Sequence, residues 1–181
     1  ESKATDYILS HGLGDWCDIG PKRPGVSQHT SLAATATPVF YMDAVTMIRA
    51  AELLGREQDA IRFRQLAEKI KRSYNTKFFH PDTKSYDRGS QAANAIALCA
   101  GLVAPDDERA VAENIAADIR ARGNALTAGD VGYNFVLRAL EAHGMSEVIY
   151  VMNSRYDVPG YGYQIARGAT ALPETWDART D

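Results

Sequence analysis

The chain has 181 residues, of which 45% are apolar and 24% charged, and its net charge at pH 7 is −3. This balance is typical of a folded globular protein and excludes disordered and collagen-like classes. No apolar run approaches the roughly 20 residues that cross a bilayer, and the basic residues are mixed with acidic ones, so we expect neither membrane insertion nor nucleic-acid binding. The two cysteines, Cys17 and Cys99, lack partners at metal-ligand spacing, and we predict no metal and no cofactor.

Three helices are predicted in the first part of the chain. Thr37 before Pro38 offers an N-cap followed by a proline at the first helical position, and an apolar stripe then runs over residues 40–54. Residues 57–74 form an amphipathic helix with a charged outer face. Residues 91–103 contain no charged side chain and are rich in alanine, which indicates a helix buried on nearly every side.

The second part of the chain continues this pattern. An acidic start predicts a helix over residues 105–123, and two further helices are expected over 131–143 and 146–153. Sparsely and heavily charged helices alternate through the first four, although the sixth breaks the alternation. The short stretch 161–165 is the one place where local strand pairing is expected. The sequence thus predicts an all-α fold of helical hairpins in an inner and an outer layer; a solenoid ranks second because the helix starts keep no fixed period.

The most informative residue is Glu174, which lies between Pro173 and Trp176 near the end of the chain. A carboxylate flanked by aromatic rings can accept a proton, and the flat ring faces suit the C–H faces of a sugar. The stretch therefore indicates a sugar-hydrolysing site. Glycoside hydrolysis generally needs a second carboxyl group, which protonates the leaving oxygen.

Five stretches in order resemble the C-terminal half of the catalytic domain of bacterial α-L-rhamnosidases, glycoside hydrolase family 78. They are Leu13-Gly14-Asp15-Trp16, the helix pair over 35–79, Ser90-Gln91-Ala92-Ala93-Asn94-Ala95, Leu126-Thr127-Ala128-Gly129-Asp130-Val131-Gly132, and Gly168-Ala169-Thr170 leading to Glu174-Thr175-Trp176-Asp177. The resemblance implies that residues 1–181 are a single all-α region forming about half of an (α/α)6 toroid and lacking its N-terminal half.

The resemblance also implies an activity, the hydrolysis of terminal α-L-rhamnose with inversion of configuration. In the family a glutamate in the position of Glu174 is the general base. The general acid lies in an Asp- and Arg-containing loop that has no match here, and a histidine that follows the Trp-Asp pair is likewise absent. We therefore expect this chain to lack the general acid and to be inactive alone.

Four further residues are candidates for sugar binding. Trp16 offers a stacking platform and Asp15 a sugar-binding acid. A buried anchor would explain Trp16 equally well, and a helix cap would explain Asp15 somewhat better. Trp176 lines the pocket or packs in the core. Tyr161 stands where relatives often have tryptophan, which keeps an aromatic surface but removes the indole N–H.

Asp130 is the last candidate for substrate binding. It lies in a glycine-flanked turn, where an aspartate most often satisfies backbone N–H groups. The histidines show no mutual spacing for a metal site and are expected at the surface. They are His11, His29, His80 and His143.

Two other functions stay open. The chain can belong to another carbohydrate-active enzyme on the same toroid, or it can be a non-catalytic helical scaffold that binds protein partners in a concave face. The expected partners are a rhamnose-containing glycoside, the remainder of the parent polypeptide and, through the unsealed flank of a half ring, a second copy of the chain. The residues leave the compartment open, and the family resemblance slightly favours a periplasmic or secreted location.

Overall fold

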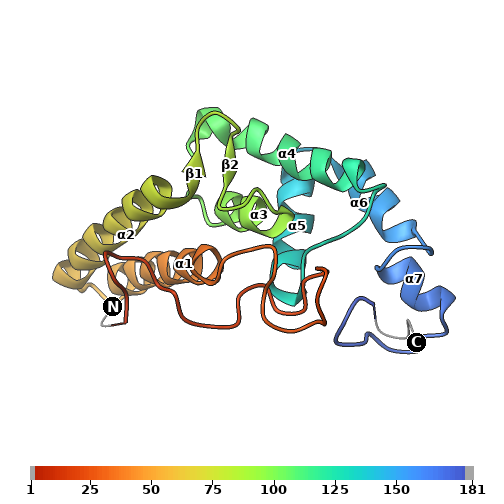
Figure 1. Ribbon diagram of the computed structural model, residues 1–181. Coiled ribbons are helices and arrows are strands. Elements are labelled where there is room, and N and C mark those ends of the chain that lie inside the picture. Colours follow the sequence, from red (N-terminus) through yellow and green to blue (C-terminus); the bar gives the residue numbers. More distant parts are fainter. Residues whose placement is uncertain (1–2, 178–181) are drawn as a thin grey trace.

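The structure, a computed structural model, describes residues 3–177, which form seven α-helices and one short hairpin (Figure 1). In chain order the elements are α1 (Leu32–Leu53), α2 (Glu57–Phe78), β1 (Phe79–His80), β2 (Ser85–Tyr86), α3 (Gln91–Cys99), a 3₁₀ turn (Pro105–Asp107), α4 (Glu108–Ala121), α5 (Asp130–Ala142), α6 (Ser146–Ser154) and α7 (Tyr161–Ala166). The strands pair antiparallel, with Phe79 opposite Tyr86. Within the described range no helix is both long and apolar enough to span a bilayer. The predicted all-α fold is confirmed.

The helices pair as hairpins and stack in two layers. α1 packs on α2, α3 on α4 and α5 on α6, while α1 contacts α3 and α3 contacts α5 to make an inner layer. Figure 1 shows α4 and α6 on one side of α3 and α5, with the α1–α2 hairpin projecting at one end of the arc and α7 at the other. α6, whose few charges break the alternation in the sequence, still takes an outer position by packing against α4 and α5.

The first helix begins earlier than predicted. Ser31, not Thr37, is its N-cap, because the Ser31 hydroxyl accepts a hydrogen bond from the Ala34 N–H. Pro38 therefore lies inside α1, where it cannot donate to the Ala34 carbonyl. The buried Tyr74 hydroxyl of α2 donates to that carbonyl instead, at 3.2 Å, and this tertiary bond makes the interior proline tolerable. The Thr37 hydroxyl instead accepts from the Leu9 N–H at 3.0 Å.

The end of α3 and the structure of residues 161–165 also differ from the predictions. α3 ends at Cys99 rather than at 103, because Gly101 takes a left-handed φ of 73° and the Leu102 N–H turns back to the Ala97 carbonyl. The predicted strand pairing over 161–165 is wrong, since these residues form α7. Gly162 permits the helix there, because a Cβ at this position would lie 2.4 Å from the Arg155 carbonyl oxygen.

The largest apolar cluster connects the helices to the C-terminal loop. It contains buried side chains of α3, α4, α5 and α6 together with Trp176, which is 8% exposed. A second cluster joins α1, α2 and the hairpin to α3. The loop that carries Glu174 is thus attached to the core through a residue only two positions away.

Candidate active site

Glu174 lies beside Trp16, 158 positions earlier in the chain. The Trp16 indole Nε1–H donates to the Glu174 Oε1 at 3.4 Å. Trp16 is half-buried in the loop before α1, whereas Glu174 is exposed in the loop after α7. In Figure 1 the N-terminal segment runs along one side of the helices and reaches the C-terminal loop. Two of the stretches singled out in the sequence therefore meet at one surface.

Asp15 holds the Trp16 loop against the start of α5. Its side chain is 0% exposed, and its two carboxylate oxygens accept the N–H groups of Gly129 at 2.9 Å and of Gly132 at 2.6 Å. This is a helix-capping arrangement made across 114 residues. Because Asp15 is fully buried in this structure, its carboxylate is not exposed to make the predicted contact with a sugar.

The backbones of the two loops are also locked together. The Asp130 N–H donates to the Trp16 carbonyl at 2.8 Å, and the Ile19 N–H donates to the Thr127 carbonyl at 3.0 Å. At Gly129 the approach is so close that a Cβ would lie 2.0 Å from the Trp16 carbonyl oxygen. Glycine is therefore required at this position for Trp16 to stand where it does.

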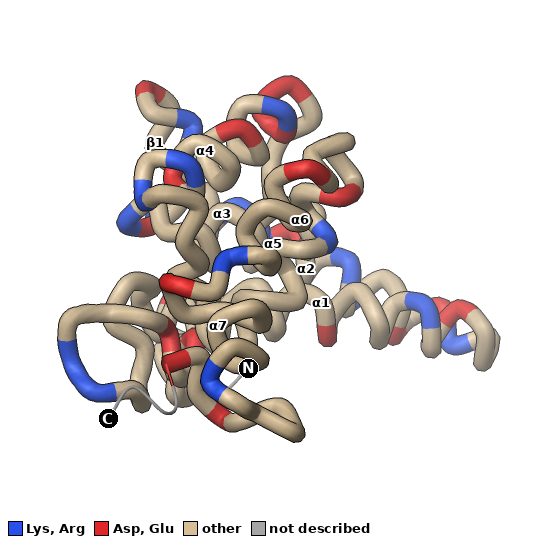
Figure 2. The backbone as a smooth tube through the Cα atoms, turned by 90° about the vertical axis from the view of Figure 1, so that its right-hand side faces the viewer, with Lys and Arg blue, Asp and Glu red and all other residues tan. Residues whose placement is uncertain are grey.

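The charges of four carboxylates act on the buried thiol of Cys17. Burial raises the pKa of this thiol, and the charges of four acidic side chains raise it further, those of Asp130, Glu174, Asp177 and Asp18. Desolvation and the charge of Glu174 raise the pKa of the Asp130 carboxyl as well. Figure 2 shows acidic positions grouped near α7 on this side of the molecule. The site is therefore negatively charged, which suits attraction of a proton or a partial positive charge.

Trp176, in the same loop as Glu174, packs against two tyrosine rings. The Trp176 ring centroid lies 4.7 Å from that of Tyr133 and 5.1 Å from that of Tyr161, and the two tyrosine rings meet edge to face at 5.6 Å. The Tyr133 hydroxyl donates to Asn153 Oδ1 at 2.7 Å, which fixes this ring on α5. Among the described residues the buried Trp176 Nε1–H has no hydrogen-bond partner. Trp176 thus has both a packing role and a free donor.

The site contains residues to which the sequence pattern assigned no role of their own. Tyr133 was missed because a tyrosine on an apolar helix face gives no signal of its own. Asp18 was missed for a similar reason: it is 1% exposed and folds the loop by accepting the N–H groups of Gln28 and His29. Gln91, 0% exposed, accepts the Thr127 N–H at 2.9 Å and so places the loop that leads to Asp130.

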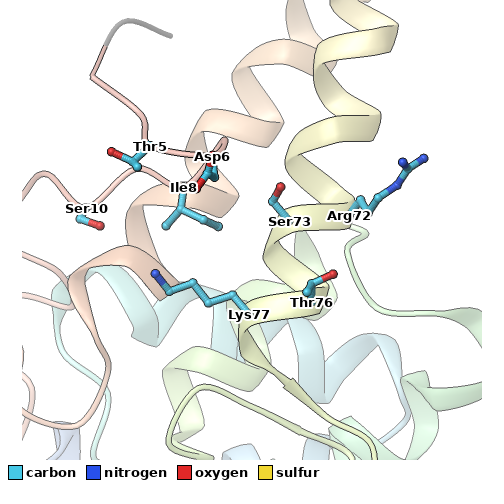
Figure 3. Close-up of a pocket in the computed structure, with 8 residues that line it drawn as sticks. All are labelled: Thr5, Asp6, Ile8, Ser10, Arg72, Ser73, Thr76 and Lys77. Atoms are coloured by element: carbon cyan, nitrogen blue, oxygen red, sulfur yellow. The ribbon is translucent and has the colours of Figure 1, made fainter.

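Two pockets lie on the α1–α2 side of the molecule. One, of about 330 Å³, is lined mainly by apolar side chains such as Leu13, Val39 and Val131, and so borders the candidate site. The other, of about 370 Å³, lies between the N-terminal segment and α2, where Lys77 points toward that segment and Arg72 points away (Figure 3). None of the predicted sugar-binding residues lines either pocket. Within residues 3–177 no group of three His, Cys, Asp or Glu side chains is placed to hold a metal ion.

The buried Asp15 makes the stability of the fold depend on pH. Desolvation raises its pKa from 3.8 to about 6, against the lowering effect of the two backbone hydrogen bonds. The native state holds this proton more tightly than the unfolded state does. The stability that Asp15 contributes is therefore fully present below about pH 3.9, the ordinary pKa of an aspartate, and is lost as the pH rises through about 6. The change corresponds to about 3 kcal/mol.

We expect this contribution to appear when the full-length protein is compared with its Asp15→Asn variant, which cannot take up the proton. Their melting temperatures, measured from pH 4 to pH 7.5, should differ most at the acid end, and the advantage of the native protein should shrink as the pH rises. The comparison cancels the titration of the other carboxylates. A difference that stays constant with pH would show that Asp15 is ionised throughout this range.

Comparisons with known proteins identify the family of the chain. All of residues 1–181 match the family described as the bacterial alpha-L-rhamnosidase 6 hairpin glycosidase domain. The alpha-L-rhamnosidase of Streptomyces avermitilis is 29% identical over 178 residues, covering 97% of this chain and 16% of the relative, and that of Formosa agariphila is 22% identical over 180 residues, covering 98% and 19%. The chain therefore spans less than a fifth of the length of these relatives.

Solved structures show the same relationship. The alpha-L-rhamnosidase from Dictyoglumus thermophilum superposes with a TM-score of 0.87 at 35% identity, over 97% of this chain and 20% of that one. The Streptomyces avermitilis enzyme, solved in complex with L-rhamnose, superposes with a TM-score of 0.85 at 26% identity, over 98% and 16%. The three hairpins seen here are thus part of a six-hairpin fold, and the chain belongs to the bacterial alpha-L-rhamnosidase 6 hairpin glycosidase domain family.

Proposed function

We propose that the protein containing this chain releases terminal α-L-rhamnose from glycosides with inversion of configuration, and that Glu174 is its general base. The observation that carries the proposal is the 3.4 Å contact between Glu174 Oε1 and Trp16 Nε1. It joins an exposed carboxylate to an indole ring in a chain whose relatives are named alpha-L-rhamnosidases. One of those relatives is described with L-rhamnose bound.

In the proposed reaction a water molecule lies between Glu174 and the anomeric carbon. The water oxygen forms a bond to that carbon while the glycosidic C–O bond breaks, and the water proton passes to Glu174. Because the Trp16 N–H engages one carboxylate oxygen, the other is left to accept the proton. The leaving oxygen takes its proton from a general acid that this chain does not supply, about 6.5 to 9.5 Å from the base as inverting enzymes require.

The proposed sugar pocket is formed by the residues around Glu174. Trp16 and Tyr161 would present ring faces to the sugar, and Asp130 an exposed carboxylate to its hydroxyl groups. The Trp176 N–H, free of partners among residues 3–177, would donate to the sugar or to an ordered water. For Asp15, with both oxygens occupied by backbone N–H groups, we propose that it positions Trp16 and Asp130.

The test is to follow the first product of the full-length protein. With an aryl α-L-rhamnoside as substrate, we expect proton NMR to show β-L-rhamnose before mutarotation sets in. The corresponding aryl glycosides of other hexoses and of uronic acids should react at least 100-fold more slowly in kcat/KM. Initial release of the α anomer would contradict inversion, and preference for another glycoside would favour a different carbohydrate-active enzyme on this fold.

A further inference from the structure

A further, smaller pocket lies between the end of α4 and the loops that precede α1, α3 and α5. It has a volume of about 160 Å³, and its walls include Gln28, His29, Arg88, Asp118, Arg122 and Thr127. Pockets that hold whole small-molecule ligands are usually larger than about 300 Å³. A space of this size suits a charged substituent better than a complete sugar ring. We call it the arginine pocket.

The two arginines of this pocket keep donors available. Arg88 donates from Nη1 to the Gln28 carbonyl at 3.1 Å, and Arg122 donates from Nε to both oxygens of Asp118 at 2.9 and 3.0 Å. Within residues 3–177 these are the hydrogen bonds that the two guanidinium groups make. Each guanidinium has five N–H donors. Most of these donors are therefore unused by the protein itself.

The charge of the pocket also favours an anion. Two guanidinium groups face a single carboxylate, that of Asp118, which is further engaged by Gln91 Nε2 at 2.9 Å. The side chains that line the pocket thus carry a net positive charge, and the further carboxylate of Asp18 is engaged by the backbone N–H groups of Gln28 and His29 in the pocket wall. Arginine is the side chain best suited to carboxylate, sulfate or phosphate oxygens, because its planar fork makes paired, charge-assisted hydrogen bonds.

The arginine pocket shares its loops with the candidate active site. Asp18 accepts the N–H groups of Gln28 and His29 at the pocket, and it follows Trp16 by two positions. Thr127 lines the pocket and precedes Asp130 by three positions. The arginine pocket and the candidate active site are therefore built on the same two loops.

We propose that the arginine pocket binds an oxyanion of the glycan substrate, either the carboxylate of a uronic acid or a sulfate ester, on a residue near the rhamnose that is removed. This inference rests on the proposed function, because it takes the anion to belong to the same glycan. If so, the substrates of the protein are acidic saccharides that contain rhamnose.

The binding test is calorimetric titration of the full-length protein with sodium sulfate, with D-glucuronate and with neutral D-glucose. We expect at least one of the two anions to bind with saturation and glucose not to bind at this pocket. Affinity for that anion should fall at least tenfold in R88Q and further in R88Q/R122Q, since each change removes charge-assisted donors. The anion that binds, sulfate or glucuronate, identifies the charged substituent of the glycan as a sulfate ester or a uronic acid.

The matched control is R120Q, because Arg120 is an exposed arginine of the same helix end that lines a different pocket. Equal weakening in R120Q, or no saturable binding of either anion by the native protein, would overturn the proposal. R88Q is the informative single variant if the double variant melts early, since Arg88 does not hold Asp118 in place.

A kinetic readout separates this proposal from the proposed function. The ratio of KM for an acidic rhamnoside disaccharide to KM for a neutral aryl rhamnoside should rise at least tenfold in R88Q and stay unchanged in R120Q. If the native protein hydrolyses no rhamnoside at all, the proposed function fails, while the titration with free anions still decides whether the pocket binds them. An unchanged ratio in R88Q would overturn the role in substrate binding.

Discussion

Replacing Glu174 with glutamine in the full-length protein is expected to lower kcat on an aryl α-L-rhamnoside by about 100-fold or more, because an amide cannot accept the proton of the attacking water. Glutamine keeps the size of the side chain and an oxygen that can still accept the Trp16 N–H. KM should therefore change much less than kcat. Steady-state kinetics with a chromogenic leaving group measures both.

The matched control for this variant is Glu141→Gln. Glu141 is exposed in the last turn of α5, the helix whose first residue is Asp130, so the same chemical change is made away from the site. Its kcat should stay that of the native protein. If Glu174→Gln kept kcat within about tenfold of the native value, base catalysis by this residue would be rejected, and the helical scaffold with a protein partner would become the leading hypothesis.

A small external nucleophile distinguishes a lost base from a damaged site. In Glu174→Ala, azide can attack the anomeric carbon without needing a base, because it carries no proton to lose. The C–N bond forms as the glycosidic C–O bond breaks, and the leaving oxygen is protonated as in the native reaction. We expect a rhamnosyl azide of inverted configuration; a variant that azide does not restore has lost more than its general base.

Most helices could be predicted from local pattern, because period and charge decide whether an amphipathic segment is helical. Residues 57–74 and 146–153 fall within α2 and α6 for this reason. The errors arose where a distant group decided the outcome. Nothing near Pro38 indicates that the Tyr74 hydroxyl, on the next helix, satisfies the Ala34 carbonyl and so lets α1 begin at Leu32.

The candidate site was predictable in part, and through motif order rather than through any single residue. Glu174 and Trp16 were both singled out, but their contact spans 158 positions and no local pattern encodes it. Asp15 illustrates the limit most clearly. An aspartate before a tryptophan suits either a sugar contact or a cap, and only the fold shows that both its oxygens accept N–H groups from another loop.

The position of Trp16 depends on Gly129, and Gly129→Ala is expected to have the largest effect on stability of any glycine change at the site. The added Cβ would lie 2.0 Å from the Trp16 carbonyl oxygen and 2.6 Å from the Asp18 N, which are backbone atoms that cannot rotate away. Overpacking of this kind costs about 3 kcal/mol or more when nothing flexible can move. The loops must separate, and the Trp16 ring would leave Glu174.

The expected result is a lower melting temperature together with a lower kcat/KM on the aryl rhamnoside, because both the core contact and the sugar platform are lost. Gly55→Ala is the control: Gly55 has a left-handed φ of 66° but no atom within 4 Å of the added Cβ, so it should cost only about 1 kcal/mol of backbone strain. Because Gly55 lies in the α1–α2 turn, that variant should keep its kcat/KM. Equal melting temperatures for the two variants would mean that the Trp16 loop does not approach Gly129 as closely as it does in this structure. The link between Asp15, Trp16 and Glu174 would then lose its structural basis.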